Sequence, residues 1–139
     1  MRFATGKDLL AIKSLQEKKL FEIPVGGLVA LNNLKIFVAV HNSNIVGFCR
    51  CGIKPGAKNE GYISKISVIK GFKGSGVGHK LLGAAHSFFA AKKVNTVFLT
   101  AHKKLLGFYE KAGYKTVLDK EPFIKMARFS PKIIRKKHL

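Results

Sequence analysis

Acidic residues are scarce in this sequence. Seven Asp and Glu stand against 26 Lys and Arg, which gives a formal net charge of +19. Such an imbalance costs self-repulsion and favours polyanionic partners. A generic solubility surface is the alternative explanation. Because acids are scarce as well as bases abundant, we favour a nucleic-acid partner, either tRNA or DNA.

Features of membrane and secreted proteins are also missing. No apolar run is long enough to cross a bilayer. The opening residues, M-R-F-A-T-G-K-D, lack the apolar core of a signal peptide. We therefore expect a cytoplasmic protein without a membrane partner.

Cysteine and histidine give few signs of special chemistry. Cys49 and Cys51 are the only cysteines and stand two apart on an expected strand. They share a face of that strand but are too close in sequence for an easy disulfide, so we expect reduced, packing thiols. The five histidines lack the spacing of metal ligands. No metal site is predicted.

Linkers and internal repeats are absent as well. A chain of 139 residues can bury a core without disulfides or metals, so we expect a single domain over residues 1–139. The last ten residues, 130–139, form a basic tail with Lys132, Arg135, Lys136 and Lys137.

A glycine-rich stretch organises the rest of the chain. Alternating apolar residues, Ile66 and Val68, lead into Gly74, Gly76 and Gly78, and a helical pattern follows. Glycine allows positive φ and a close approach of the backbone to a ligand. The free N–H groups of the following helix favour an anion, so the stretch predicts a phosphate site. Glycines that serve packing alone are the alternative.

Periodicity predicts a mixed α/β sheet. Thr5 and Asp8 resemble a helix cap, and the first helix should run to about Leu20. Residues 27–33 fit either a short helix or an irregular crossover, with Asn32 and Asn33 preceding the next strand. The other expected elements are strands at Lys35–His41, Ile45–Ile53 and Gly61–Ile69, a helix ending near Lys92-Lys93, a parallel strand at Val94–Thr100, a helix at Lys103–Ala112 stopped by Gly113, and an antiparallel pair at Tyr114–Leu118 and Phe123–Phe129.

Three segments in register resemble the GNAT superfamily of acetyl-CoA-dependent N-acetyltransferases. They are the opening Arg2–Leu9, the stretch V-x-x-x-x-K-G-x-G-V-G-x-x-L-L over Val68–Leu82, and Phe108-Tyr109-Glu110-Lys111-Ala112-Gly113-Tyr114, which is similar to the family's "FYEKxGF" signature. The resemblance implies a single GNAT-like domain of about six to seven strands and three to four helices. It also implies acetyl-CoA as co-substrate.

The resemblance implies roles for individual residues. Tyr109 matches the general acid that returns a proton to the CoA thiolate, and a phenol with a pKa of about 10 suits that task. An aromatic that only packs is the alternative. The strand backbone at Ile66 and Val68 would hold pantetheine. The pyrophosphate would lie on the loop formed by Gly74, Ser75, Gly76, Val77, Gly78 and His79.

Two positions depart from the family pattern. Lys73 stands where Arg or Gln is usual, so it offers phosphate a positive charge but no bidentate fork. His102 stands where many members carry Asn. It could donate to the pantetheine arm, carry a proton or cap the following helix, and the cap is slightly favoured.

The strand over Tyr62–Ile69 has no acidic residue, although many family members place a carboxylate base there. The nearest acid, Glu60, precedes it. An amine with a pKa near 7.7 is about a third neutral near pH 7.4, whereas a lysine amine is neutral only about one part in a thousand. The missing base therefore favours a weakly basic amine, such as that of aminoacyl-tRNA or a modified base. A water chain to Glu60 or a histidine would still permit lysine.

The sequence thus predicts acetyl transfer to a primary amine by direct attack, because neither cysteine lies in a motif that hosts a covalent intermediate. The acceptor is expected on a nucleic acid. Two alternatives stay open: an acceptor on a protein or small molecule, and a GNAT-fold nucleic-acid-binding protein that has lost catalysis. Tyr109 and the intact glycines argue against the latter.

Overall fold

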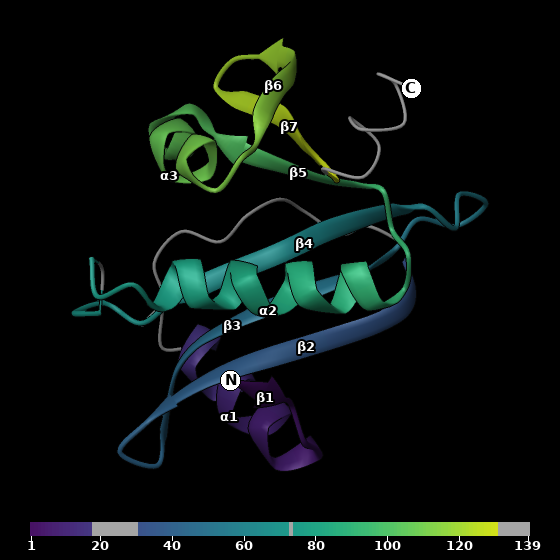
Figure 1. Ribbon diagram of the computed structural model, residues 1–139. Coiled ribbons are helices and arrows are strands. Elements are labelled where there is room, and N and C mark those ends of the chain that lie inside the picture. Colours follow the sequence, from purple (N-terminus) through teal and green to yellow (C-terminus); the bar gives the residue numbers. More distant parts are fainter. Residues whose placement is uncertain (18–30, 73, 131–139) are drawn as a thin grey trace.

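A seven-stranded mixed sheet forms the centre of the molecule. The computed structural model describes residues 1–17, 31–72 and 74–130. The strands lie in the order β1-β2-β3-β4-β5-β7-β6, and among these neighbours only β4 and β5 run parallel (Figure 1). Their bounds are Arg2–Phe3 (β1), Asn32–His41 (β2), Asn44–Ile53 (β3), Glu60–Val68 (β4), Thr96–His102 (β5), Lys115–Lys120 (β6) and Phe123–Phe129 (β7). The predicted mixed α/β sheet is confirmed.

The first helix, α1 (Gly6–Glu17), starts where the sequence predicts. The Asp8 amide donates to Thr5 Oγ1 at 3.3 Å, and the Thr5 amide donates to Asp8 Oδ2 at 2.8 Å. This reciprocal pair satisfies two amides at the helix start, and Arg2 pairs with the same carboxylate. The predicted end near Leu20 and most of the undecided 27–33 segment lie outside the described residues.

The β2–β3 hairpin begins earlier than predicted. Asn32 and Asn33 belong to β2, where Asn33 has a φ of 49° and the register shifts between Asn32 and Lys35. An asparagine tolerates this left-handed conformation, so the strand continues through a pair that reads as a breaker. Asn42 and Ser43, both with positive φ, form the tight turn to β3.

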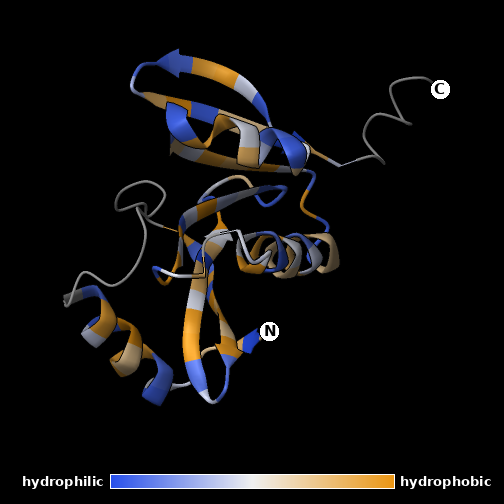
Figure 2. Cartoon of the chain, turned by 90° about the vertical axis from the view of Figure 1, so that its left-hand side faces the viewer, coloured by the Kyte–Doolittle hydropathy of each residue, from blue (hydrophilic) through white to orange (hydrophobic). Residues whose placement is uncertain are grey.

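Helix α2 (Val77–Ala91) covers one face of β2–β4, and α1 lies on the opposite face (Figures 1 and 2). The helical pattern predicted after the glycines is confirmed, and its apolar face is buried at Leu81, Leu82, Ala85, Phe88 and Phe89. Close approach depends on Gly61, since a Cβ there would lie 2.5 Å from the ring of Phe89. Cys49 and Cys51 are free and fully buried in this layer, as expected of packing thiols.

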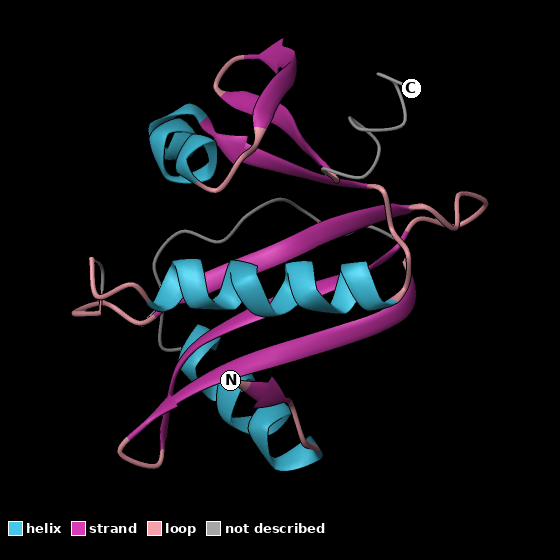
Figure 3. Ribbon diagram, viewed as in Figure 1, coloured by secondary structure: helices cyan, strands magenta, loops and turns pink. Residues whose placement is uncertain are grey.

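The expected helix over Lys103–Ala112 is two short pieces. In Figure 3 this helical segment lies at the end of β5. A 3-10 turn, η1 (Lys103–Leu105), leads into α3 (Leu106–Lys111), and Gly113 follows with a φ of 94°. The predicted C-terminal antiparallel pair is confirmed as β6 and β7. None of the helices in the described part of the chain is long and apolar enough to cross a membrane.

Candidate active site

The parallel strands β4 and β5 separate halfway along their length. They pair at three positions, from Glu60 with Thr96 to Tyr62 with Phe98. Beyond these, both strands continue without further pairing to each other. In Figure 1 the two strands lie together at the right and diverge towards the left, where α3 and the loop before α2 lie. The separation leaves one backbone edge of β4, over residues 63–68, without a strand partner among the residues that the structure describes.

A bulge at Ser64 accompanies the separation. Arg50 pairs with Lys65 and Cys51 pairs with Ile63, so Ser64 is an extra residue in β4. Its hydroxyl donates to the Arg50 carbonyl at 3.2 Å and accepts from Arg50 Nη1 at 3.2 Å. Bulges bend the strand that carries them. This bulge stands two residues beyond the last β4–β5 pair.

The three glycines before and within α2 serve two purposes. Gly74 and Gly76 have φ values of 81° and 85°, and, their chain neighbours aside, no atom of the described residues lies within 4 Å of where their Cβ atoms would be. Gly76 is the N-cap of α2 and provides no side-chain acceptor. Gly78 differs, because its Cβ would lie 2.8 Å from Cζ of Phe108. The loop is therefore open at its first two glycines, and the third allows α2 to meet α3.

The other predicted loop residues vary in what they can offer. Both the amide and the hydroxyl of Ser75 donate to the Phe72 carbonyl, which engages them within the loop. His79 is exposed, with its ring centroid 4.5 Å from that of Phe108. Val77 is half-buried against the core. Lys73 lies outside the described residues.

Ile66 and Val68 lie on the diverging half of β4. Ile66 is buried and Val68 is half-buried, and both side chains pack in the core on the α2 side. Their side chains are therefore committed to packing. Only their backbone, on the edge facing away from β3, is available to a ligand.

Tyr109 lies on α3, beside the separation. It is 1% exposed, and its ring packs edge-on against Phe108 at 4.9 Å and Tyr114 at 5.8 Å between centroids. Burial, with a smaller effect of Cys49, raises the pKa of the Tyr109 hydroxyl above its ordinary value. The phenol is therefore protonated at neutral pH. Within the described residues, no hydrogen bond reaches this hydroxyl.

Sequence reasoning missed a buried polar pair next to Tyr109. His86 Nε2, from α2, lies 2.7 Å from the Tyr114 hydroxyl. Burial lowers the pKa of His86 to about 4, assisted by the nearby Arg128 guanidinium. The sequence did contain one sign of this pair: Tyr114 occupies the last position of the signature segment, where the family has Phe. The pair ties α2 to the segment between α3 and β6.

His102 adopts the capping role that the sequence slightly favoured. Its Nδ1 accepts a hydrogen bond from the Lys104 amide at 3.2 Å at the start of η1. On β4 and β5, the hydroxyls of Tyr62 and Thr100 lie 2.9 Å apart, a contact not predicted from the sequence. Glu60 lies at the closed, paired end of the strands.

The comparisons identify the family. The model of the Acetyltransferase (GNAT) family matches residues 10–114. This chain belongs to that family. The predicted enzyme class, an acetyl-CoA-dependent acyltransferase of the GNAT family, is therefore confirmed, as is acetyl-CoA as its co-substrate. Comparison of the sequence with curated proteins gives no match.

Solved structures show the same fold at low sequence identity. A ribosomal-protein-alanine N-acetyltransferase from Brucella melitensis is 16% identical with a TM-score of 0.72, over 93% of this chain and 98% of that one. The Escherichia coli ribosomal-protein-S18-alanine N-acetyltransferase has a TM-score of 0.72 at 15% identity, over 92% and 91%. The PaiA N-acetyltransferase from Thermoplasma acidophilum, solved with coenzyme A, has a TM-score of 0.65 at 18% identity, over 89% and 70%.

Proposed function

We propose that this acetyltransferase modifies a weakly basic primary amine by direct attack, with the amine carried on a nucleic acid. The observation that carries the catalytic part is the separation of β4 from β5, between the glycine loop and the helix of Tyr109. The glycine loop suits an anion, the diverging half of β4 has backbone groups that do not pair with β5, and α3 supplies the buried phenol of Tyr109.

The residues present fit acetyl-CoA. The loop at Gly74 and Gly76 is open, and the first amides of α2 receive no side-chain cap, so they are available to phosphate. The free edge of β4 at Ile66 and Val68 can exchange hydrogen bonds with the amides of a pantetheine arm. The bound co-substrate supplies an activated acetyl thioester at this place. His79, in the first turn of α2, has an exposed side chain.

Tyr109 would act as the general acid. Because its hydroxyl stays protonated at neutral pH, it can donate to a departing thiolate, whose pKa is about 8.5. The buried cysteines cannot serve as nucleophiles. Cys49 and Cys51 are 0% exposed, and the Cys51 thiol together with burial raises the pKa of Cys49. The proposed mechanism is therefore direct attack of the acceptor amine on the thioester, without a covalent intermediate on a cysteine.

The acceptor must lose its proton with little help from a carboxylate. Glu60 begins β4, and Ser64 lies four residue steps further along the strand, a rise of about 13 Å. The pKa gap between a lysine amine and an α-amine, about 2.7 units, corresponds to roughly 3.7 kcal/mol of barrier. An aminoacyl ester or a modified base offers an amine of low pKa. Both are attached to phosphate backbones, which the net charge of +19 favours.

A protein α-amine is the second candidate. It is favoured by the fold likeness to two enzymes named for acetylating a ribosomal-protein alanine. Such an amine also has a pKa near 7.7, so the missing carboxylate does not separate the two candidates. A small-molecule amine, as in the similar aminoglycoside 6'-acetyltransferase, explains the charge least well.

The deciding experiment follows radiolabelled acetyl-CoA into separate pools. We expect label in aminoacyl-tRNA or in tRNA bases, and an initial rate of labelling about 10²-fold lower with the Tyr109→Phe variant at the same protein concentration. Deacylated tRNA separates the two acceptors, because only base amines remain in it. If every nucleic acid stays unlabelled, label in the protein pool would replace the proposal with the second candidate, and label in the polyamine pool would replace it with a small-molecule acceptor.

A further inference from the structure

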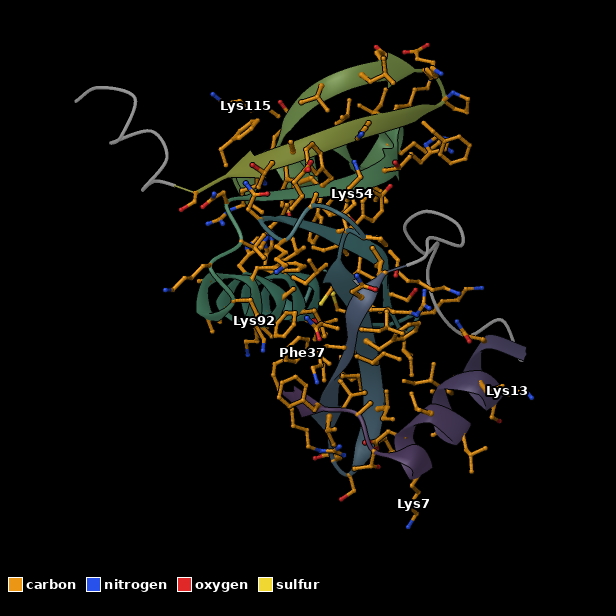
Figure 4. All side chains as sticks on the ribbon, turned by 90° about the vertical axis from the view of Figure 1, so that its right-hand side faces the viewer. Lys7, Lys13, Phe37, Lys54, Lys92 and Lys115 are labelled. Carbon is orange, nitrogen blue, oxygen red and sulfur yellow. The ribbon has the colours of Figure 1, made fainter. Side chains whose placement is uncertain are left out.

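Four exposed lysines gather at the end of the molecule opposite the glycine loop. Lys54 and Lys58 belong to the β3–β4 loop, and Lys92 and Lys93 follow the C-terminus of α2. Figure 4 looks onto this end, with Lys54 and Lys92 labelled. We call these four residues the lysine end.

Hydrogen bonds hold the two loops of the lysine end together. The amides of Asn95 and Thr96 donate to the Asn59 carbonyl at 2.8 and 3.3 Å. The β3–β4 loop is closed on itself by the Lys54 amide, which donates to the Glu60 carbonyl at 2.9 Å. The two segments that carry these lysines are therefore joined through their backbone at one end of the molecule.

No ion pair in the described part of the chain neutralises these charges. Within residues 1–17, 31–72 and 74–130, ion pairs form only between Arg2 and Asp8 and between Lys103 and Glu121. Glu60 is the acidic residue that adjoins the lysine end, and it forms neither of these pairs. An exposed cluster of like charges repels itself and so raises the free energy of the unbound protein. A bound polyanion relieves this repulsion.

A helix-capping role explains only part of the cluster. Cations near the C-terminus of α2 interact favourably with its dipole, which accounts for Lys92. Lys93 has a φ of 59°, a conformation that glycine adopts at lower cost, so its side chain is retained against local preference. Lys54 and Lys58 lie on another element and are not explained by the helix.

The lysine end is also too far from the glycine loop to bind the same phosphates. The 15 residues of α2 span about 22 Å, well beyond the Debye length of about 8 Å at physiological salt. The described chain ends next to the cluster, where the Ser130 amide donates to the Asn95 carbonyl at 2.8 Å. Four of the next seven residues in the sequence are basic.

We infer that the lysine end is a docking surface for the phosphate backbone of a nucleic acid, remote from acetyl-CoA. The choice of a nucleic acid over other polyanions rests on the proposed function. Since the contacts are to phosphate, binding should depend on salt and not on base sequence. The surface would hold the body of the acceptor while its amine reaches the separation of β4 and β5.

The test compares two variants of the full chain that remove equal charge. One carries Lys54→Gln, Lys58→Gln, Lys92→Gln and Lys93→Asn, with Asn chosen because it tolerates positive φ. The control carries four exposed lysines changed to Gln elsewhere: Lys7, Lys13, Lys111 and Lys120. Lys7 and Lys13 lie on α1, away from the lysine end (Figure 4). Deacylated, fluorescently labelled tRNA is titrated at several salt concentrations.

We expect the lysine-end variant to flatten the slope of log affinity against log salt by about 0.7 for each phosphate that it no longer neutralises. The control should leave the slope nearly unchanged, and both variants should keep the thermal stabilisation by coenzyme A. Equal flattening in both variants, or an unchanged lysine-end variant, overturns the inference. So does binding to phosphatidylserine vesicles with no binding to tRNA.

Failure of the docking surface and failure of the proposed function give different results. If tRNA binding maps to the lysine end but no nucleic acid accepts label, the docking surface stands and the proposed acceptor is wrong. If aminoacyl-tRNA is acetylated by the lysine-end variant with the wild-type KM, the acceptor stands and the docking surface is wrong.

Discussion

The two ends of α2 are built in opposite ways. At its C-terminal end, β4 and β5 are paired and Gly61 lies against Phe89 without room for a methyl group. At its N-terminal end, the strands have separated, and Gly74 and Gly76 have no neighbour within 4 Å of a Cβ position. One helix on one sheet thus provides a closed end that stabilises the fold and an open end that can take a ligand. Glycine is needed at both, for reasons that substitutions can tell apart.

A bulky residue at the open end should have the largest effect on ligand binding. Gly76→Val places a β-branched side chain at a φ of 85° and in the path of an approaching phosphate. Coenzyme A at a hundred times its Kd stabilises a protein by about 2.7 kcal/mol, and we expect the variant to lose all of this. Differential scanning fluorimetry with and without coenzyme A measures it. A wild-type chain that shows no shift would refute the phosphate loop itself.

Removing the Tyr109 hydroxyl should affect turnover and leave binding intact. We expect Tyr109→Phe to lower kcat about 10²-fold, the low end of general-acid effects, with the affinity for acetyl-CoA unchanged. Tyr114→Phe is the matched control, because it removes a neighbouring buried hydroxyl outside the proposed chemistry. Equal activity of Tyr109→Phe and wild type would leave Tyr109 as a packing residue.

Filling the closed end should affect stability and leave ligand binding intact. In Gly61→Ala the added methyl lies 2.5 Å from the Phe89 ring, and overpacking of this kind costs about 1–3 kcal/mol. Gly83→Ala, in the open middle of α2, should instead stabilise by up to about 1 kcal/mol. Chemical denaturation of both variants tests the contrast. A neutral Gly61→Ala would mean that Phe89 can move aside.

The His86–Tyr114 pair should make the free energy of unfolding depend on pH in the acidic range. Folding lowers the pKa of His86 to about 4 from its ordinary 6.5, so the unfolded chain binds the proton first. Stability from this group is complete above pH 6.5 and falls as the pH drops towards 4, by roughly 3 kcal/mol. Denaturation at several pH values measures the decrease. His86→Phe should abolish that part of the pH dependence, and an unchanged profile would exclude His86 as its source.

The sequence predicted what depends on local pattern. The apolar face of α2, the Thr5 cap and the glycine loop all follow from spacing, and each is found where expected. It could not reveal contacts between distant segments. In the sequence Gly78 looks like one of three loop glycines. In the structure, a side chain at this position would collide with the ring of Phe108, 30 residues later. The Ser64 bulge is similarly hidden, because pairing with Arg50 decides it.

Local backbone geometry was a second source of error. Asn33 was expected to precede β2, but it lies within the strand at a φ of 49°. Nor could residue type show that the amide and hydroxyl of Ser75 donate to the Phe72 carbonyl within the glycine loop. In both cases the backbone adopts a local geometry that residue type alone does not specify.

The contact between Gly78 and Phe108 constrains how this protein can change over evolutionary time. A methyl group at position 78 would collide with the Phe108 ring, and a smaller residue at 108 would leave a cavity beside Tyr109. Each change alone is costly, whereas the two together restore the summed volume, so their effects should not add. Positions 78 and 108 therefore form a size-complementary pair that can drift only jointly, although one belongs to the proposed cofactor loop and the other adjoins the proposed acid.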